Sequence, residues 1–258
     1  MSTADINGTT IHFEDTGGDL PAVVLSHGFL MDHSMFDAQV EALRGTHRVV
    51  TWDERGFGGT LATGDFTYWD SARDVLALMD HLGIASAVVG GMSQGGFISL
   101  RVALTAPERV TGLILLDTQA GTEDPATIEP YNALHQAWIE HGSVAVQDVI
   151  ASLILGPGEW PEWFAKWARI APDQFTPAFR CLMHRDDVTD RLGEIVAPSL
   201  IVHGTADAAI PMVKAEVLRD GLGGPTTLVA VEGGPHAANI THAAEVNAAI
   251  LRFLAGLG

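Results

Sequence analysis

Residues 88–97 read VVGGMSQGGF, and this stretch decides the fold. Within it, residues 91–95 match the pattern Gly-x-Ser-x-Gly, after an apolar run typical of a strand and before a segment typical of a helix. Glycines two residues before and after a serine leave room for neighbouring backbone at a sharp strand-to-helix turn. Such a turn is strained and exposes the serine hydroxyl. We therefore predict that Ser93 is a nucleophile.

Other interpretations of these glycines are weaker. A five-residue pattern also occurs in ordinary glycine-rich turns, although the strand before it and the helix after it favour the nucleophile turn. A phosphate loop of the Walker type needs Gly-Lys-Ser/Thr, and residues 88–97 contain no lysine. The dinucleotide-binding pattern Gly-x-Gly-x-x-Gly is not met either.

Strands and helices are predicted to alternate along the chain on both sides of this stretch. Short apolar runs without polar alternation are typical of buried parallel strands, and apolar residues at helical spacing predict helices. An Asn-Gly pair at residues 7–8 predicts an opening hairpin. The predicted strands are 22–26, 48–52, 85–89, 110–116, 199–203 and 227–231, and the predicted helices are 71–82, 97–106 and 243–254. We expect an α/β protein with a mostly parallel sheet covered on both faces.

A helical insertion interrupts this alternation. From residue 120 to about residue 192 the segments have helical patterns, prolines separate them, and four of the six tryptophans fall among them. Strand patterns then return. We therefore divide the chain into a first core part at 1–119, a helical lid at 120–192 and a second core part at 193–258.

Composition excludes several classes of partner. The formal net charge is −18, which leaves no basic surface for a phosphate backbone, so no nucleic-acid partner is expected. The single cysteine, Cys181, allows no intrachain disulfide. No apolar run approaches the ~18 residues of a membrane span, and the first residues lack the pattern of a signal peptide. We expect a cytoplasmic protein without a membrane partner; the sequence does not indicate the oligomeric state.

A base and an acid for Ser93 are found downstream. A serine hydroxyl needs a base, and His236 lies in a glycine-rich loop after the last predicted strand. Asp207 follows the preceding strand and suits the acid that orients the histidine, in the order Ser, Asp, His. Asp117, at the end of another strand, is the alternative acid, and His242 is the alternative base. We predict a triad of Ser93, Asp207 and His236.

Two backbone N–H groups are expected to stabilise the oxyanion. The N–H of Gln94 lies at a helix start, where unpaired amides favour negative charge. The second donor is expected from the loop after residues 22–26, with the Phe29 N–H as the candidate and Gly28 allowing close approach. The scattered histidines and single cysteine form no metal pattern, so neither a metal nor a cofactor is predicted.

Five motifs together resemble the α/β-hydrolase superfamily. They occur in the expected order across the core, which is more specific than any one of them. The motifs are Ser26-His27-Gly28-Phe29, Asp53-Glu54-Arg55-Gly56-Phe57-Gly58, Gly91-Met92-Ser93-Gln94-Gly95-Gly96, His203-Gly204-Thr205-Ala206-Asp207 and Gly234-Pro235-His236. The resemblance implies the α/β-hydrolase fold, with a sheet of about eight strands and a helical lid after the sixth.

The chain is similar to the branch of carboxylesterases, enol-lactonase-like lactonases and cofactor-free perhydrolases, with two departures. Many relatives have Gly-His in the last motif, where this chain places Pro235 before the histidine. Gln94 replaces the common Met or Leu after the nucleophile, and its polar side chain is expected to approach the pocket. Epoxide hydrolases and haloalkane dehalogenases have Asp at the nucleophile position, so Ser93 argues against both.

The predicted reaction is hydrolysis of a carboxylic ester or lactone through an acyl-enzyme. The expected substrate is a small molecule with apolar character, bound between core and lid. The predicted lining residues are Phe29, Leu30, Met31, Trp69, Met92, Trp138, Trp160 and Trp163. Plain packing of the lid helices is the alternative role for the lid tryptophans. Alternative functions are a perhydrolase or haloperoxidase, a C–C bond hydrolase with the same triad, and a non-catalytic ligand receptor.

Overall fold

A computed structural model describes residues 2–257, so residues 1 and 258 of the predicted core parts lie outside the described range. An eight-stranded sheet forms the centre, in the order β1-β2-β4-β3-β5-β6-β7-β8. Its strands are β1 (Ser2–Ile6), β2 (Thr9–Asp15), β3 (Ala22–Ser26), β4 (Arg48–Trp52), β5 (Ala87–Met92), β6 (Val110–Leu116), β7 (Ser199–Gly204) and β8 (Thr226–Val231). Strands β3 to β8 pair in parallel with one another. Strand β2 pairs antiparallel with both β1 and β4. The predicted fold class is confirmed.

The opening hairpin has the turn that its sequence predicts. Asn7 and Gly8 have φ angles of 48° and 80°, as a two-residue turn of type I′ requires. Ile6 pairs directly with Thr9 across this turn. The hairpin adds two strands to one edge of the parallel sheet, and of these only β2 runs opposite to the parallel strands.

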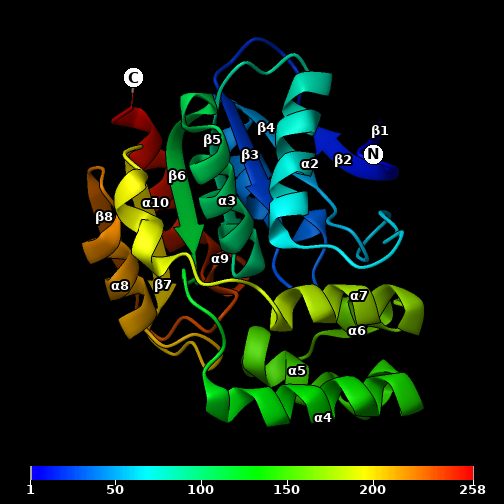
Figure 1. The fold of residues 1–258 in the computed structure, drawn as a ribbon. Coiled ribbons are helices and arrows are strands. Elements are labelled where there is room, and N and C mark those ends of the chain that lie inside the picture. The colour runs from blue at the N-terminus through cyan, green and yellow to red at the C-terminus, as the bar shows by residue number, and fades with distance from the viewer. Residues whose placement is uncertain (1, 258) are drawn as a thin grey trace.

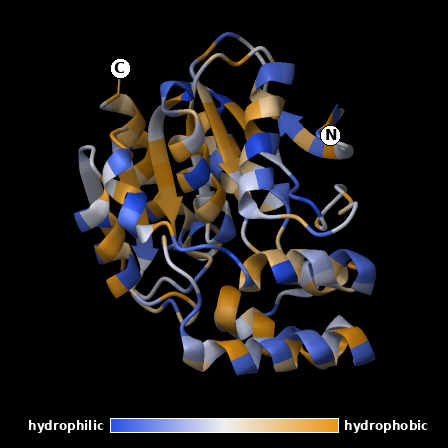
Figure 2. Cartoon of the chain, viewed as in Figure 1, coloured by the Kyte–Doolittle hydropathy of each residue, from blue (hydrophilic) through white to orange (hydrophobic). Residues whose placement is uncertain are grey.

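Helices cover both faces of the sheet. In Figure 1, α2 (Tyr68–His81) and α3 (Gln94–Thr105) lie in front of the central strands and α10 (Ala243–Ala255) lies behind them. The remaining core helices are α1 (Asp37–Leu43), α8 (Val213–Gly221) and α9 (Ala238–Thr241), with short 3-10 turns at His33–Phe36, Pro107–Arg109 and Thr189–Glu194. Figure 2, in the same view, shows hydrophobic residues concentrated on β3 and β6. The core therefore lies between the sheet and its helices.

Helix α2 begins three residues before its predicted start at residue 71. Thr67 accepts a hydrogen bond from the Asp70 backbone, and the Asp70 side chain accepts one from the Thr67 backbone. This reciprocal cap satisfies amides that the first turn leaves unpaired. The apolar spacing from residue 71 does not reveal this cap, which starts the helix at Tyr68.

Four helices follow β6 and lie together beyond the ends of the parallel strands (Figure 1). They are α4 (Pro125–His141), α5 (Gln147–Ile154), α6 (Pro161–Trp167) and α7 (Pro172–Met183), with a 3-10 turn at Ser143–Ala145. We call α4–α7 the lid. Pro125, Pro161 and Pro172 each stand at a helix start, where the missing N–H costs no intrahelical bond. That the lid forms a unit separate from the core stays a prediction.

Among residues 2–257, no helix combines the length and apolar character needed to cross a membrane.

Candidate active site

Ser93 stands between β5 and α3 in a strained conformation. Its φ and ψ angles are 52° and −113°, a region that non-glycine residues rarely adopt. The end of β6 holds it there, because the Ser93 N–H donates to the Leu116 carbonyl at 2.9 Å and its carbonyl accepts from the Thr118 hydroxyl at 2.7 Å. Strain of this kind costs on the order of 1–3 kcal/mol and persists where neighbours fix the backbone.

The glycines beside Ser93 are required by close backbone approach. A Cβ atom at Gly91 or at Gly95 would overlap the carbonyl oxygen of Ser26, at the end of the neighbouring strand β3. A Cβ atom at Gly96 would overlap the Thr118 side chain. Any other residue at these positions would push the turn away from the sheet.

Asp207 and His236 lie in hydrogen-bonding contact. His236 Nδ1 is 2.7 Å from Asp207 Oδ2, and the Asp207 side chain is fully buried. Asp207 Oδ1 accepts from the N–H groups of Ala209 and Ile210, each at 2.8 Å. An acceptor at Nδ1 fixes the proton on that nitrogen and leaves Nε2 able to accept one. His236 lines the same cavity as Ser93.

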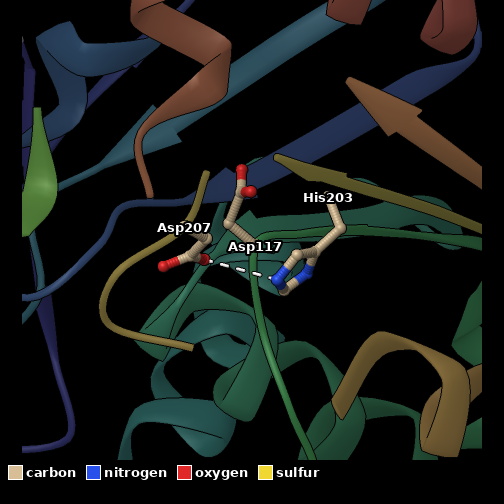
Figure 3. Close-up of side chains that lie close together, drawn as sticks. All are labelled: Asp117, His203 and Asp207. Atoms are coloured by element: carbon tan, nitrogen blue, oxygen red, sulfur yellow. Dashed lines mark ion pairs between the residues drawn. The ribbon is translucent and has the colours of Figure 1, made fainter. Parts of the chain in front are cut away.

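The alternative acid, Asp117, lies behind Asp207 and is not a hydrogen-bond partner of His236. Figure 3 shows it beside Asp207 and His203. Its Oδ1 accepts from the Gly204 N–H at 2.7 Å. Burial and the Asp207 charge raise the pKa of Asp117 well above its usual range, which favours a neutral carboxyl.

His203 completes this group beside Asp207. One ligand atom from each of Asp117, His203 and Asp207 lies within 4.8 Å of the others, a spacing that a metal ion could use. However, His203 Nε2 is 2.8 Å from the Ile210 carbonyl and 3.4 Å from Asp207 Oδ2, the contact drawn in Figure 3. Burial lowers the pKa of His203, so its ring is neutral. Hydrogen bonds already engage both Asp207 oxygens, and the group acts as a frame for that carboxylate.

The loop after β3 forms a tight turn beside Ser93. The Met31 N–H donates to the Gly28 carbonyl at 3.0 Å, and Leu30 has a φ of 63°. A Cβ atom at Gly28 would overlap the sulfur of Met92. Within residues 2–257 the Phe29 N–H has no hydrogen-bond partner, and the Gln94 N–H, first in α3, has none within its helix. Both N–H groups therefore remain available to a ligand.

His27 organises this loop without facing a substrate. Its Nε2 accepts from the Glu54 N–H at 2.9 Å, so its proton lies on Nδ1, 2.7 Å from the Gly28 carbonyl. Burial lowers the pKa of His27 and keeps the ring neutral. Glu54 is itself buried; burial raises its pKa to about 8, and the Ser71 hydroxyl donates to it at 2.5 Å.

The side chain of Gln94 points into the core, away from the cavity where it was expected. Tyr68 Oη donates to Gln94 Oε1 at 3.2 Å, and both side chains are buried. Gln94 is not among the residues that line the cavity. The amide lies between α3 and α2, where its oxygen accepts from Tyr68, while within residues 2–257 its buried Nε2 has no hydrogen-bond partner.

A cavity of about 100 Å³ lies between Ser93 and the lid. The core side contributes Phe29, Leu30, Met92 and Phe97 beside Ser93 and His236. The lid side is mostly aliphatic and aromatic; its apolar residues are Leu134, Ile150, Leu153, Ile154, Phe175, Phe179 and Leu182. This small apolar volume suits a short acyl or alkyl group.

Five predicted lining residues lie outside this cavity. Met31 is buried under the loop, and Trp69 donates to Asp186 at 3.0 Å on the protein surface. In the lid, Trp138 packs on Phe175 with ring centroids 4.5 Å apart. Trp160 and Trp163 lie at the start of α6, where Trp160 donates to Gly156 and Trp163 lies 4.4 Å from the Lys166 ammonium. The lid tryptophans therefore pack lid helices, the alternative considered above.

Two lid contacts that the sequence did not reveal reach the loops that carry Phe29 and His236. The indole of Trp167, fully buried, donates to the Leu30 carbonyl at 2.7 Å. The Ile154 carbonyl accepts from the Ala237 N–H at 2.7 Å, directly after His236. Pro235, the departure in the histidine motif, faces the lid at Gly156, where an added Cβ atom would approach its ring to 3.1 Å. The lid thereby positions both loops.

Comparisons with known proteins agree with the fold described above. A family model described as alpha/beta hydrolase fold matches residues 21–143. A protein of Variovorax paradoxus named "Putative carbamate hydrolase RutD" is 30% identical, covering 95% of this chain and 96% of its own length. A thermophilic esterase from Thermogutta terrifontis is 28% identical with a TM-score of 0.88, covering 99% of this chain and 97% of its own. The enol-lactonase from Burkholderia xenovorans is 26% identical with a TM-score of 0.90, covering 98% and 100%.

Proposed function

Because the chain belongs to the α/β-hydrolase family, we propose that it is a serine hydrolase that cleaves a small carboxylic ester or lactone through an acyl-enzyme. One observation carries the proposal: Ser93, strained at the start of α3, shares a cavity with His236, whose Nδ1 is 2.7 Å from the buried Asp207. The arrangement supplies a nucleophile, a base and an orienting acid.

Acylation uses the groups around Ser93. His236 Nε2 takes the hydroxyl proton while Ser93 Oγ attacks the carbonyl carbon, and the negative charge moves to the carbonyl oxygen. The N–H groups of Phe29 and Gln94 stabilise this oxyanion, helped by the helix dipole of α3. The intermediate then collapses, the bond to the alkoxy oxygen breaks, and His236 gives its proton to the leaving alcohol.

Deacylation repeats these steps with water. His236 takes a proton from water, the hydroxide attacks the acyl carbon, and Ser93 leaves with the proton returned by His236. Asp207 stays ionised and stabilises the imidazolium that forms in each half-reaction.

Two features support a small substrate with apolar character. The free volume is about 100 Å³, and most of its lining is aliphatic or aromatic. The esterase and the enol-lactonase named above have the same fold over nearly the whole chain, and their names support esters and lactones as substrates. The carbamate hydrolase name adds a carbonyl that the same serine could attack.

A serine-reactive fluorophosphonate tests the proposal. We expect the intact mass to rise by one adduct, peptide mapping to place it on Ser93, and short-chain 4-nitrophenyl esters to be hydrolysed. Butyrolactone and a phenyl carbamate in the same assay rank the three substrate classes. If Ser93 stays unlabelled and none of these compounds is hydrolysed, the protein is a ligand receptor on this fold and the proposal is wrong.

A further inference from the structure

The apolar cavity contains polar residues that the proposed mechanism does not use. Apart from Ser93 and His236, they are Glu123, Tyr131 and His135. Among them His135 is satisfied within the lid: its ring stacks on Phe179 at 4.2 Å and its Nε2 is 3.3 Å from the Thr176 hydroxyl. Glu123 and Tyr131 require another explanation.

Glu123 is fixed by a buried arginine. Arg185 Nη1 donates to Glu123 Oε1 at 2.8 Å, and the two side chains are 1% and 10% exposed respectively. Arg185 also donates to the carbonyl oxygens of Gly121 and Leu182, and its guanidinium carbon lies 4.4 Å from the centroid of the Phe97 ring. Arg185 thus links the segment before α4 to the end of α7 and holds the Glu123 carboxylate beside the cavity.

One carboxylate oxygen is left without a protein partner. Within residues 2–257, Glu123 accepts a single side-chain hydrogen bond, at Oε1, and Oε2 accepts none. The Glu123 side chain is 10% exposed and Oε2 is not shut off from solvent, so water or a substrate group can reach this oxygen. Glu123 also borders a second, polar hollow lined by residues 119–125, so it stands between that hollow and the cavity.

Tyr131 supplies a hydroxyl on the same wall. In the part of the chain that the structure describes, its hydroxyl has no protein hydrogen-bond partner. Burial, and then the charge of Glu123, raise the pKa of Tyr131 to about 12, so the hydroxyl keeps its proton at neutral pH. The residues that line the cavity therefore include one with a free acceptor oxygen, Glu123, and one with a free hydroxyl donor, Tyr131.

We propose that Glu123 and Tyr131 bind a hydroxyl group carried by the substrate, so that the enzyme prefers hydroxylated esters over alkyl esters of the same shape. A hydroxyl donates one hydrogen bond and accepts others, which matches this pair of groups. A substrate carboxylate would meet the like charge of Glu123 and bind poorly. The inference rests on the proposed function, because the substrate must reach Ser93 for the preference to be measured.

Matched esters test the preference. On the acyl side, 4-nitrophenyl 3-hydroxybutyrate is compared with 4-nitrophenyl 3-methylbutyrate, which has a methyl group in place of the hydroxyl. On the alcohol side, 3-hydroxypropyl acetate is compared with butyl acetate. We expect kcat/KM to favour the hydroxylated member of one pair at least about fivefold, as one hydrogen bond to a charged group would give. The pair that responds shows which side of the ester bond faces Glu123.

Substitutions then assign the preference to the two residues. In Tyr131→Phe and in Glu123→Gln the ratio of kcat/KM for the hydroxylated ester to kcat/KM for its alkyl counterpart should fall severalfold. Glu123→Gln should also raise kcat/KM for 4-nitrophenyl succinate, because the like charge is gone and Arg185 remains. Glu129→Gln, on the exposed side of α4, removes the same charge outside the cavity and should change neither value. Tyr131→Phe keeps the test valid if the loss of the ion pair destabilises Glu123→Gln.

The outcomes separate this inference from the proposed function. If wild type shows no preference in either pair, or if both substitutions leave the ratio unchanged, the inference is wrong, and the Glu123 carboxylate serves the outer hollow or the lid ends. If Ser93 is not labelled and no ester is hydrolysed, the proposed function itself fails.

Discussion

The cavity lies between the ends of the strands on one side and the lid on the other, and these two regions hold their residues in place by different means. Beneath the cavity, backbone contacts fix the geometry: Ser93 is held by the end of β6, and Gly91 and Gly95 allow contact with β3. In the lid, side chains pack on one another, as Trp138 does on Phe175. We call the strand-end loops that carry Ser93, Asp207 and His236 the floor.

This difference suggests a division of labour. Small errors in the floor would move the reacting atoms and affect every substrate equally. Changes in the lid would alter the shape of the cavity and affect substrates selectively. Substitutions in the floor and in the lid test that division.

Removal of the proposed nucleophile should have the largest effect. We expect Ser93→Ala to lower kcat by about 10⁶ for every ester, because no other group forms the acyl-enzyme. Ser93→Gly should be equally inactive but about 1 kcal/mol more stable than Ser93→Ala, since glycine tolerates the φ of 52°. Ester hydrolysis and urea unfolding measure the two effects. Residual turnover near wild type in Ser93→Ala would exclude the floor as the catalytic centre.

The two buried aspartates should differ sharply. Asp207→Asn is expected to lower kcat by about 10⁴, because the amide disturbs the proton position on His236. Asp117→Asn is the matched control and should lose far less, since Asp117 contacts the Gly204 backbone and not the histidine. Equal losses in the two variants would mean that the acid has been assigned wrongly.

Glu54, which contacts His27 and Ser71 in the core, should affect the free energy of unfolding and leave substrate preference unchanged. The pKa of the Glu54 carboxyl is 4.5 in the unfolded chain and about 8 in the folded protein. Between pH 4.5 and pH 8 the carboxyl is therefore ionised in the unfolded state but still protonated in the folded state. The free energy of unfolding therefore falls as pH rises through this window. Glu54→Gln, which stays neutral, should be on the order of 2 kcal/mol more stable than wild type at pH 7.5 and nearly equal at pH 5. Urea unfolding at both pH values measures this; a gap that does not grow with pH contradicts it.

A lid substitution should change selectivity by a smaller factor. Leu153 lines the cavity and is only half-buried, so Leu153→Ala widens the cavity at modest cost to folding. We expect the kcat/KM ratio of 4-nitrophenyl hexanoate to butyrate to rise about tenfold, while fluorophosphonate labelling of Ser93 stays unchanged. Val149→Ala, an exposed change on the same helix, is the control. A fall in activity on all chain lengths alike would break the distinction between lid and floor.

The same difference explains how much could be predicted from the sequence. The mostly parallel α/β sheet was predictable, because apolar runs and the glycine pattern are local consequences of buried parallel strands and a sharp turn. The α/β-hydrolase fold with about eight strands was implied by the resemblance of the five motifs. Asp207 and His236 could be singled out because strand ends converge at one edge of a parallel sheet. Their catalytic roles stay predictions until the variants are measured.

The lid lining could not be predicted in the same way. Trp160 and Trp163 were expected in the cavity because aromatic residues are common in pockets, but which side of a helix faces a cavity depends on how the helix rotates against its neighbours. The contacts of Trp167 and Arg185 join residues 137 and 64 positions away, and no periodicity within a segment encodes such pairs. The first turn of α2 is marked by the reciprocal Thr67–Asp70 cap, which apolar spacing alone does not reveal.

The hydrogen bonds from Trp167 to Leu30 and from Ala237 to Ile154 limit how this architecture can be recombined. A lid transplanted from a relative brings its own cavity lining. It must also provide the two hydrogen bonds that hold the loops carrying Phe29 and His236. A graft without a donor at position 167 would leave the Leu30 carbonyl unpaired in a turn that is already strained. Chimeras of such hydrolases should therefore be joined by matching these two contacts first and the lining residues second.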